Sequence, residues 1–270
     1  MSNEPLRYRD APGRRAAILD RLRSTGYLTI SEVADHLGVS EMTARRDVKR
    51  MDEDGEVLSV RGGLRLPPDD TSGSEYTWRA SADTEAKAAV GTAAVECVRP
   101  DDVIAVDAGT TAFQLAAHLP PSFAGTVVTH SVPVIDLMMD RPEVKAIALG
   151  GDVYRPSRAL VGSATLEVAR GLRVRTFYLG AAAVDERGIY AAADVERNVK
   201  HTLMDIADRV VLLIDHHKFG ATAPVLLCGW ERLAAVVTDQ TPPPAIAERL
   251  ERDGVELVLP GDTPSQALYG

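Results

Sequence analysis

Residues 40–51, SEMTARRDVKRM, constrain the fold more than any other stretch of this sequence. Apolar residues recur there at helical spacing, so one narrow stripe of an α-helix would carry Ala44, Val48 and Met51. The other side chains, mostly opposite that stripe, are basic or carry a hydroxyl: Thr43, Arg45, Arg46, Lys49 and Arg50. A short helix that is apolar behind and basic in front suits the major groove of DNA, where side chains read base edges. The charges alone would also fit a solvated helix face.

The residues before this segment predict a second helix that is joined to it by a tight turn. Thr29 and Glu32 fit a capping box, in which each side chain bonds the other residue's amide. The helix that they open ends at Gly38, a residue suited to the left-handed conformation after a helix. Ser40 follows closely and is a good N-cap for the basic helix. Two short helices separated by a glycine-containing turn are typical of the helix-turn-helix motif.

Two short apolar runs after the basic helix predict a β-hairpin. Residues 57–61 and 64–66 flank a Gly-Gly pair, which suits the positive φ of a hairpin turn. This hairpin would be the wing of a winged helix and would offer Arg61 and Arg65 to phosphates. We therefore predict a winged helix-turn-helix domain over residues 1–66, with a first helix over 14–24 and residues 1–12 disordered. Its DNA-binding residues would be Ser40, Thr43, Arg45, Arg46, Lys49, Arg50 and Arg61.

The net charge of −9 is compatible with a DNA-binding domain because it is divided unevenly along the chain. Residues 1–68 hold 12 Lys and Arg against 11 Asp and Glu, and the remainder holds 18 against 28. The acidic excess of the remainder disfavours loose, non-specific coating of nucleic acid.

The sequence shows no apolar run of about 18 residues and no signal segment, and Cys97 and Cys228 are interpreted as buried free thiols. We expect a cytoplasmic protein that contacts no membrane and carries no cofactor.

The sequence changes character after the predicted wing. Residues 67–75 are rich in proline, glycine, acids and hydroxyls and are predicted to be a linker. From residue 76 to 270, helices alternate with short apolar strands, which is the pattern of an α/β domain with a mainly parallel sheet. Strands are expected at 103–106, 126–129, 144–149, 176–179, 210–214 and 235–237. Helices are expected at 83–98 and 195–207, and also after residues 107–111 through 118 and after residues 130–131 to 140.

Ligands of open α/β sheets bind outside the carboxyl ends of the strands. One such end in this sequence places a glycine and two threonines before a helix, where free amides and the helix dipole favour an anion. Hydroxyls, amides and lysines at these ends could bind a phosphate-bearing effector. The candidates are Asp107, Gly109, Thr110, Thr111, His130, Ser131, Gly150, Gly151, Lys200, Asp215 and Lys218. The alternative interpretation is structural, with Asp107 capping the turn at Thr110 and with Lys218 solvated.

The sequence predicts neither a metal site nor a nucleotide site. His216 and His217 are adjacent, so we expect their side chains to diverge, and no histidine pair at helical spacing or cysteine pair supports them. The chain also lacks a Gly-x-Gly-x-x-Gly fingerprint and a Walker lysine-serine pattern.

As a set, these motifs resemble the DeoR family of bacterial sugar-operon regulators over about residues 14–239. The matching stretches are 18–19, 28–34, 39–47, 61–63, 107–111, 150–151, 161–162, 179–181, Glu196 with Lys200, Asp215 with 218–220, and 238–239. The resemblance implies a repressor of a carbohydrate-metabolism operon, with a sensor domain similar in fold to pentose-phosphate isomerases and a phosphorylated sugar or related metabolite as effector. This chain has His130 where the family has asparagine, and His216-His217 where it has two serines.

An isomerase with a DNA-binding appendage is the alternative from another functional class. Aldose–ketose interconversion needs a carboxylate base near the substrate carbons. The strand end that resembles the acidic loop of the isomerases has no carboxylate before Asp185, so we expect a protein that is not an enzyme. An activator would share the same residues as a repressor. Because one winged helix makes few DNA contacts, we also expect a homo-oligomer, a dimer or a tetramer, on double-stranded operator DNA.

Overall fold

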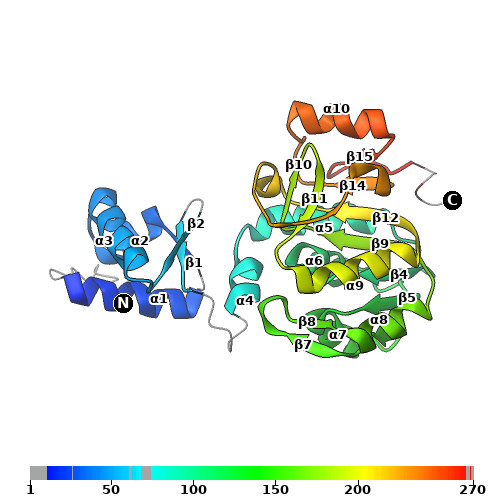
Figure 1. The fold of residues 1–270 in the computed structure, drawn as a ribbon, viewed down its shortest axis with the longest axis horizontal. Coiled ribbons are helices and arrows are strands. Elements are labelled where there is room, and N and C mark those ends of the chain that lie inside the picture. The colour runs from blue at the N-terminus through cyan, green and yellow to red at the C-terminus, as the bar shows by residue number, and fades with distance from the viewer. Residues whose placement is uncertain (1–10, 26, 61–62, 68–73, 266–267, 269–270) are drawn as a thin grey trace. The chain divides into compact units, whose positions relative to one another are not determined.

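The computed structural model describes residues 11–25, 27–60, 63–67, 74–265 and 268 of the chain (Figure 1). The chain forms two compact units, Met1–Ala82 and Asp83–Gly270. The first helix begins at Ala11, inside the segment 1–12 that was expected to be disordered; residues 1–10 and most of the predicted linker, 68–73, lie outside the described residues. Among the described residues, no helix combines the length and the apolar character of a membrane span.

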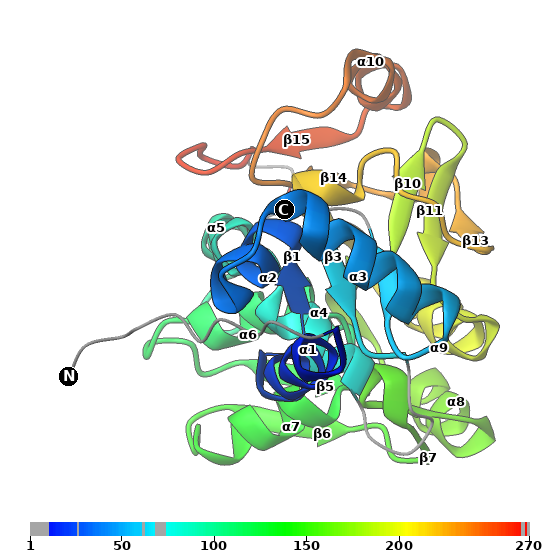
Figure 2. The ribbon, with the colours of Figure 1, turned by 90° about the vertical axis from the view of Figure 1, so that its left-hand side faces the viewer.

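The first unit contains the predicted helix-turn-helix. Its helices are α1 (Ala11–Thr25), α2 (Ile30–Leu37) and α3 (Glu41–Glu53), and α2 packs directly against α3 (Figure 2). The stripe predicted for the basic helix is confirmed, because Ala44, Val48 and Met51 are buried in a core shared with the other two helices. Gly38 ends α2 in the left-handed conformation with φ of 63°, as expected from its position.

A small antiparallel sheet completes this winged helix. Over the described residues, β1 (Tyr27–Thr29), β3 (Gly63–Arg65) and β2 (Leu58–Val60) pair in that order. The expected hairpin of β2 and β3 is confirmed, although its turn at 61–62 lies outside the described residues. The sequence did not predict β1, which is three residues long. A Cβ on Gly63 would lie 2.1 Å from the carbonyl oxygen of Leu28, so only glycine lets β1 approach β3 this closely.

The helix α4 (Ser74–Ser81) groups with the first unit. The ring of Trp78 lies 6.0 Å from that of Tyr27, and the Arg65 guanidinium lies 5.2 Å from the Trp78 ring centre. Arg65, which was expected to be available to phosphate, is therefore half-buried against an aromatic ring, and burial lowers its pKa. The sequence analysis began the second domain at residue 76, inside this helix; its exact domain limits stay a prediction.

The second unit is built on a parallel sheet. In the described part of the chain, seven strands are paired in the order β15 (Glu256–Val258), β14 (Ala235–Val237), β12 (Ala207–Leu213), β9 (Val174–Gly180), β4 (Val103–Val106), β5 (Thr126–Thr129) and β6 (Lys145–Ala148). The strands expected from the sequence are all present, and β15 is an addition. The predicted α/β class with a parallel sheet is confirmed.

Helices cover both faces of this sheet, so its central strands are apolar on both sides. Along β9, Phe177 and Leu179 belong to one core, whereas Tyr178 between them belongs to the other. The helices of this unit are α5 (Thr84–Val95), α6 (Thr110–His118), α7 (Val132–Met139), α8 (Ser163–Arg170), α9 (Asp194–Asp205) and α10 (Pro244–Asp253). The helices α8 and α10 were not predicted.

Two small antiparallel sheets accompany the main one and were also not predicted. They are β7 (Asp152–Tyr154) with β8 (Ala159–Val161), and β10 (Ala183–Asp185) with β11 (Gly188–Ala191) and β13 (Val225–Cys228).

The two cysteines form no disulfide within the described residues. Cys97 is buried, as expected, whereas Cys228 is only half-buried; burial raises the pKa of their thiols to about 12 and about 11.

Candidate DNA-binding surface and effector site

The start of α3 is fixed by side chains that sequence analysis assigned to DNA. The hydroxyl oxygen of Ser40 accepts a hydrogen bond from the Thr43 amide at 3.3 Å and lies 3.0 Å from the Thr43 hydroxyl. The capping box before α2 is also present, because the Glu32 amide donates to Thr29 Oγ1 at 3.1 Å and the Thr29 amide donates to Glu32 at 2.7 Å. These caps hold both helices of the motif at defined starting points.

The basic side chains of α3 are exposed and weakly held. Arg45 lies 3.6 Å from Glu41, and Lys49 lies 3.8 Å from Glu53; all four side chains are more than half exposed. Such surface pairs contribute little stability, so a phosphate or a base edge can replace the carboxylate. The other two basic residues of this face, Arg46 and Arg50, are exposed and pair with no carboxylate among the described residues. Arg61 lies outside the described residues.

A hollow of 490 Å³ lies beside this helix, between α3, the start of α2 and the small sheet. Arg45 and Lys49 line it, together with the exposed hydroxyl residues Ser31 and Ser59. Sequence analysis missed both serines. Ser31 is the second residue of α2, and only its position in a helix-turn-helix could have indicated that it lines a hollow together with α3.

A partly buried ion pair joins α3 to α1. The Arg14 guanidinium donates from Nε to Asp47 Oδ2 at 2.6 Å and from Nη2 to Oδ1 at 3.1 Å. This two-point contact joins α1 to α3 and is the strong form of an arginine–carboxylate pair. Sequence analysis did not identify it, because the pairing crosses 33 residues.

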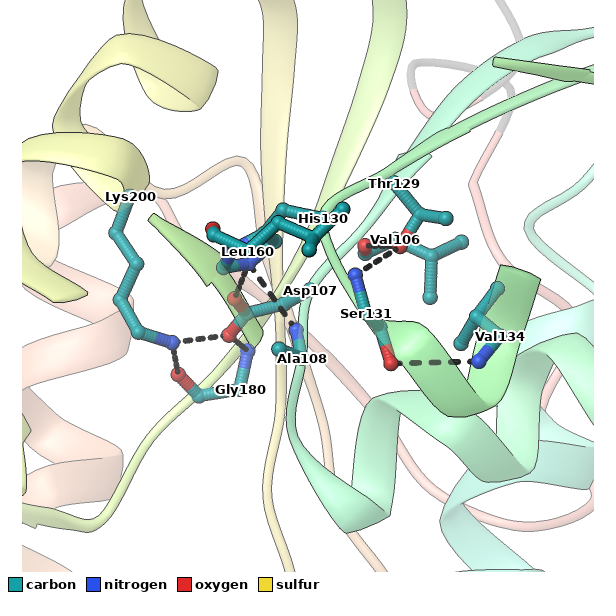
Figure 3. A network of polar contacts seen from close by, with 10 residues as sticks. All are labelled: Val106, Asp107, Ala108, Thr129, His130, Ser131, Val134, Leu160, Gly180 and Lys200. Atoms are coloured by element: carbon teal, nitrogen blue, oxygen red, sulfur yellow. Dashed lines mark hydrogen bonds and ion pairs between the residues drawn. The ribbon is translucent and has the colours of Figure 1, made fainter. Parts of the chain in front are cut away.

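In the second unit, four elements meet at the carboxyl end of the sheet through one carboxylate (Figure 3). Asp107 follows β4 and is fully buried. Its Oδ1 lies 2.9 Å from His130 Nε2, and its Oδ2 accepts from the Gly180 amide at 2.8 Å and from the Lys200 ammonium. The ammonium also donates to the Gly180 carbonyl at 3.2 Å. Burial alone would raise the pKa of Asp107, but Lys200 and His130 together hold it well below its usual range.

His130 is also fully buried, and its ring connects three segments. Its Nδ1 lies 3.2 Å from the Leu160 carbonyl, while its Nε2 faces both Asp107 and the Ala108 amide, the latter at 3.2 Å. Nε2 cannot donate to the carboxylate and accept from the amide at the same time, so the proton position decides which contact forms. Asp107 and His130, two of the effector-site candidates, contact each other in the interior.

The start of α6 is the part of the predicted site where no side chain caps the helix. Gly109 is its N-cap and has no side chain, so no side-chain bond caps the first turn. The alternative in which Asp107 caps this turn is wrong, since that carboxylate bonds His130, Gly180 and Lys200 instead. The hydroxyl residues Thr110 and Thr111 are 7% and 8% exposed, beside the amides of the turn.

Three other candidate residues have a structural role. Ser131 is buried and its hydroxyl oxygen accepts from the Val134 amide at 3.4 Å, which caps α7. Gly150 and Gly151 have φ of 69° and 109°, a conformation that side chains rarely adopt. A Cβ on Gly151 would also lie 2.1 Å from the Thr165 hydroxyl oxygen. Their identity is thus explained by backbone conformation and packing.

The turn after β12 differs from its prediction. The rings of His216 and His217 lie 3.8 Å apart, so the expectation that they diverge is wrong. The backbone amide and Nδ1 of His216 contact the Asp239 carboxylate at 2.7 and 2.5 Å. Lys218 is half-buried and forms no ion pair with a described residue. Asp215 is fully buried next to this turn.

The remaining carboxylate of interest, Asp185, organises a hairpin. Its Oδ1 accepts from the amides of Arg187 and Gly188 at 2.8 and 3.2 Å, and its Oδ2 accepts from the Tyr190 hydroxyl at 3.0 Å. With both oxygens engaged between β10 and β11, this carboxylate is not arranged as a base for substrate chemistry.

Known proteins match both units of the chain. The DeoR-like helix-turn-helix domain matches residues 14–69, and the DeoR C terminal sensor domain matches residues 82–240. The HTH-type transcriptional repressor GlcR of Bacillus subtilis is 30% identical over 246 residues, which cover 91% of this chain and 95% of that protein. The glycerol-3-phosphate regulon repressor of Escherichia coli is 27% identical over 249 residues, with 91% and 98% covered. The solved structure of ribose 5-phosphate isomerase A from Methanocaldococcus jannaschii covers 51% of this chain and 55% of its own, at 18% identity and a TM-score of 0.38.

Proposed function

The chain belongs to the DeoR family of transcription regulators, and from this premise we propose that it represses a carbohydrate-metabolism operon under the control of a phosphorylated metabolite. The observation that carries the proposal is the exposed basic face of α3 over a buried apolar stripe, at the second helix of a helix-turn-helix. Two relatives that match nearly the whole chain are named repressors, one of them of a glycerol-3-phosphate regulon. Such a regulator acts on the chromosome, so we place it in the cytoplasm.

On DNA, we assign base reading to Arg45 and Arg46 and phosphate contacts to Lys49, Arg50 and Arg61. Arg45 and Arg46 belong to the first half of α3, the part of a recognition helix that reaches base edges. Their weak or absent carboxylate partners leave both guanidinium groups available to bases. Ser40 and Thr43 bond each other at the start of α3, and we assign to them the positioning of this helix end beside the DNA backbone.

We assign the phosphate of the effector to the start of α6 and to Lys218. The N-terminal turn of α6 supplies amides and the hydroxyls of Thr110 and Thr111, and a helix N-terminus favours an anion. Of the two predicted lysines, Lys200 is neutralised by Asp107, whereas Lys218 has no carboxylate partner among the described residues. The charge that selects a phosphate over a neutral sugar therefore belongs to Lys218.

A thermal-shift screen tests the effector. Sugar phosphates and the matching unphosphorylated sugars should be compared, because a ligand at one hundred times its Kd stabilises the folded state by about 2.7 kcal/mol. We expect a rise in melting temperature with one or more phosphates only, and no rise in the Lys218→Ala variant. The matched control is Arg252→Ala, which removes an exposed cation from α10. A response of Lys218→Ala with unchanged dose dependence would exclude Lys218 from the effector site.

We also propose a homo-oligomer whose interface lies along β6. This strand is last in the sheet order, and Lys145, Ala146 and Ala148 on it are exposed. Met139, at the end of the adjacent helix α7, is 77% exposed. An open strand edge with apolar neighbours is a template for pairing with a second chain. Light scattering at micromolar concentration should give at least a dimer, and a strictly monomeric mass with and without DNA would contradict this.

We propose that the chain is not an isomerase. Asp185 is occupied by three hydrogen bonds, and Asp107 is neutralised by Lys200, so neither carboxylate is free to act as a base. Incubation with pentose and hexose phosphates should give no interconversion above the rate of the buffer. Turnover above that background would overturn this assignment.

A further inference from the structure

The turn that follows β12 brings together three side chains that can bind a metal ion. Asp83, Asp215 and His217 each offer one ligand atom, and these atoms lie within 4.8 Å of one another. The imidazole lies between the two carboxylates: its Nδ1 is 3.6 Å from Asp215 Oδ1, and its Nε2 is 3.6 Å from Asp83 Oδ1. Both separations are too long for a hydrogen bond. The three groups therefore converge without satisfying one another.

Asp215 is the member of this cluster that needs a partner. Its side chain is 0% exposed, and neither carboxylate oxygen has a hydrogen-bond partner among the described residues. A buried carboxylate without hydrogen bonds or counter-charge is strongly unfavourable. A cation beside Oδ1 would supply the missing counter-charge on the side that His217 occupies.

Asp83 and His217 leave the site open to solvent. Asp83 precedes α5 as its N-cap, in the left-handed conformation with φ of 51°, but its side chain makes no capping bond. The side chains of Asp83 and His217 are 35% and 48% exposed. An ion can therefore enter from solvent and keep water ligands. Asp83 is also the first residue of the second unit, so a bound ion would tie that residue to the end of β12.

The ligand set selects the class of metal. An imidazole nitrogen suits transition metals such as Zn²⁺ and Mn²⁺, whereas Mg²⁺ and Ca²⁺ take oxygen ligands. Bonds of about 2.0–2.2 Å to a tetrahedral ion place its ligand atoms about 3.3–3.6 Å apart. Small rotations of the two exposed side chains, Asp83 and His217, close the present separations to that range. A single ion takes one ring nitrogen of His217 and leaves the other to water.

We propose that Asp83, Asp215 and His217 bind one divalent transition-metal cation. These three residues are not among the proposed phosphate contacts, although Lys218 directly follows His217 in the chain. The site uses a histidine where the family has serine. Sequence analysis expected no metal because His216 and His217 lack a partner at helical spacing. The third ligand comes from Asp83, which lies more than a hundred residues earlier in the chain.

The test is isothermal titration of the full chain, freed of metal by a chelator, with ZnCl₂, MnCl₂ and MgCl₂. We expect one Zn²⁺ to bind per chain, Mn²⁺ to bind with lower affinity than Zn²⁺, and Mg²⁺ to show no saturable binding. His217→Asn should weaken Zn²⁺ binding at least about tenfold, the minimum effect of disturbing a metal site. Asp215→Asn should do the same and keeps the shape of the side chain. The matched control is His118→Asn, which alters an exposed histidine of the same unit.

Substitution with Co²⁺ gives a second readout, because its visible absorption reports the ligand set. The His217→Asn variant should lose the spectrum of the wild-type chain, and His118→Asn should keep it. If Asp215→Asn fails to fold, the exposed His217 still carries the test, since its replacement disturbs no core contact. The proposal is overturned if Zn²⁺ shows no saturable binding up to about millimolar concentration, the weak end of the range for protein metal sites, or if His217→Asn binds as the wild type does.

Discussion

The charges on α3 and the charges at the carboxyl end of the parallel sheet are held in opposite ways. On α3, Arg45 and Lys49 are exposed and lie 3.6 and 3.8 Å from carboxylates that are also more than half exposed. At the sheet, Asp107 and Lys200 are buried against each other. A weakly paired surface charge can exchange its partner for a ligand, whereas a buried pair cannot release one partner without leaving the other unpaired. The first arrangement suits recognition, and the second suits the support of a site.

This difference separates residue types that look alike in the sequence. Lys200 lies on α9 and Lys218 lies in the turn after β12, and both were candidates for an anion. Lys200 is bound to Asp107 and Gly180, while Lys218 has no ion-pair partner among the described residues. The comparison therefore predicts that replacing Lys200 lowers the stability of the second unit strongly. Replacing a basic side chain of α3 should instead weaken DNA binding and leave stability unchanged.

The largest expected effect is the removal of the buried ammonium. Lys200→Met should destabilise the second unit by about 3–5 kcal/mol, because it leaves a buried carboxylate without its counter-charge. Urea unfolding measures this. The matched control is Arg252→Met, an exposed cation of the same unit, which should change stability by less than about 0.5 kcal/mol. Equal effects of the two substitutions would contradict the structural role of Lys200.

The pH dependence of stability sharpens the same contrast. The pKa of Asp107 in the folded chain lies well below its usual value of about 3.9 in an unfolded chain. Its contribution to stability is therefore complete above about pH 4 and is lost as the pH falls towards the folded-state pKa. Asp107→Asn should be less stable at pH 7 and should lose less stability between about pH 4 and pH 2.5. If the stability of the wild-type chain and of Asp107→Asn fell in parallel as the pH was lowered, Asp107 would not have this stabilising role.

A smaller effect is expected at the start of the recognition helix. Ser40→Ala removes the hydroxyl that accepts from the Thr43 amide and should cost about 1 kcal/mol of stability in the first unit. Ser40→Asp restores an acceptor and should recover most of the loss. Thermal unfolding followed by circular dichroism compares the three proteins. An unchanged midpoint in Ser40→Ala would show that this cap does not stabilise α3.

The smallest expected effects concern single phosphate contacts. Lys49→Ala and Arg50→Ala should each lower the slope of log K against log salt by about 0.9, because each removes one charge that displaces a counterion. Both should weaken all DNA sequences alike, without a change in sequence preference. Fluorescence anisotropy over a series of salt concentrations measures the slope. A changed base preference in either variant would move that residue from phosphate contact to base reading.

Local patterns were enough to predict the first unit, whereas the sensor site depends on contacts that sequence patterns do not encode. The stripe of Ala44, Val48 and Met51 and the caps at Thr29 and Ser40 each lie within a few residues, so periodicity and capping rules find them. Asp107 and Lys200 are 93 residues apart, and only the order of the parallel strands brings them together. The same holds for Asp83 and His217.

Several helices and strands were not predicted from the sequence, again because contacts distant in the chain determine them. The strands β1, β7 and β8 are three residues long and show no alternation that could be recognised. The helix α4 was not predicted, and Trp78 fixes it to the first unit through rings and a guanidinium from β1 and β3. The polar composition around it indicated a linker instead. Tertiary contacts, and not local propensity, decide such short segments.

The most direct test of the account compares DNA binding by the wild-type chain and the Arg45→Ala/Arg46→Ala double variant. A duplex selected by the wild type from a random pool serves as the ligand, and anisotropy at one fixed salt concentration gives both affinities. We expect a loss of at least about tenfold, since each base-contacting arginine contributes about 1–3 kcal/mol, with unfolding unchanged. Wild-type affinity in the double variant would contradict the assignment of α3 as the recognition helix.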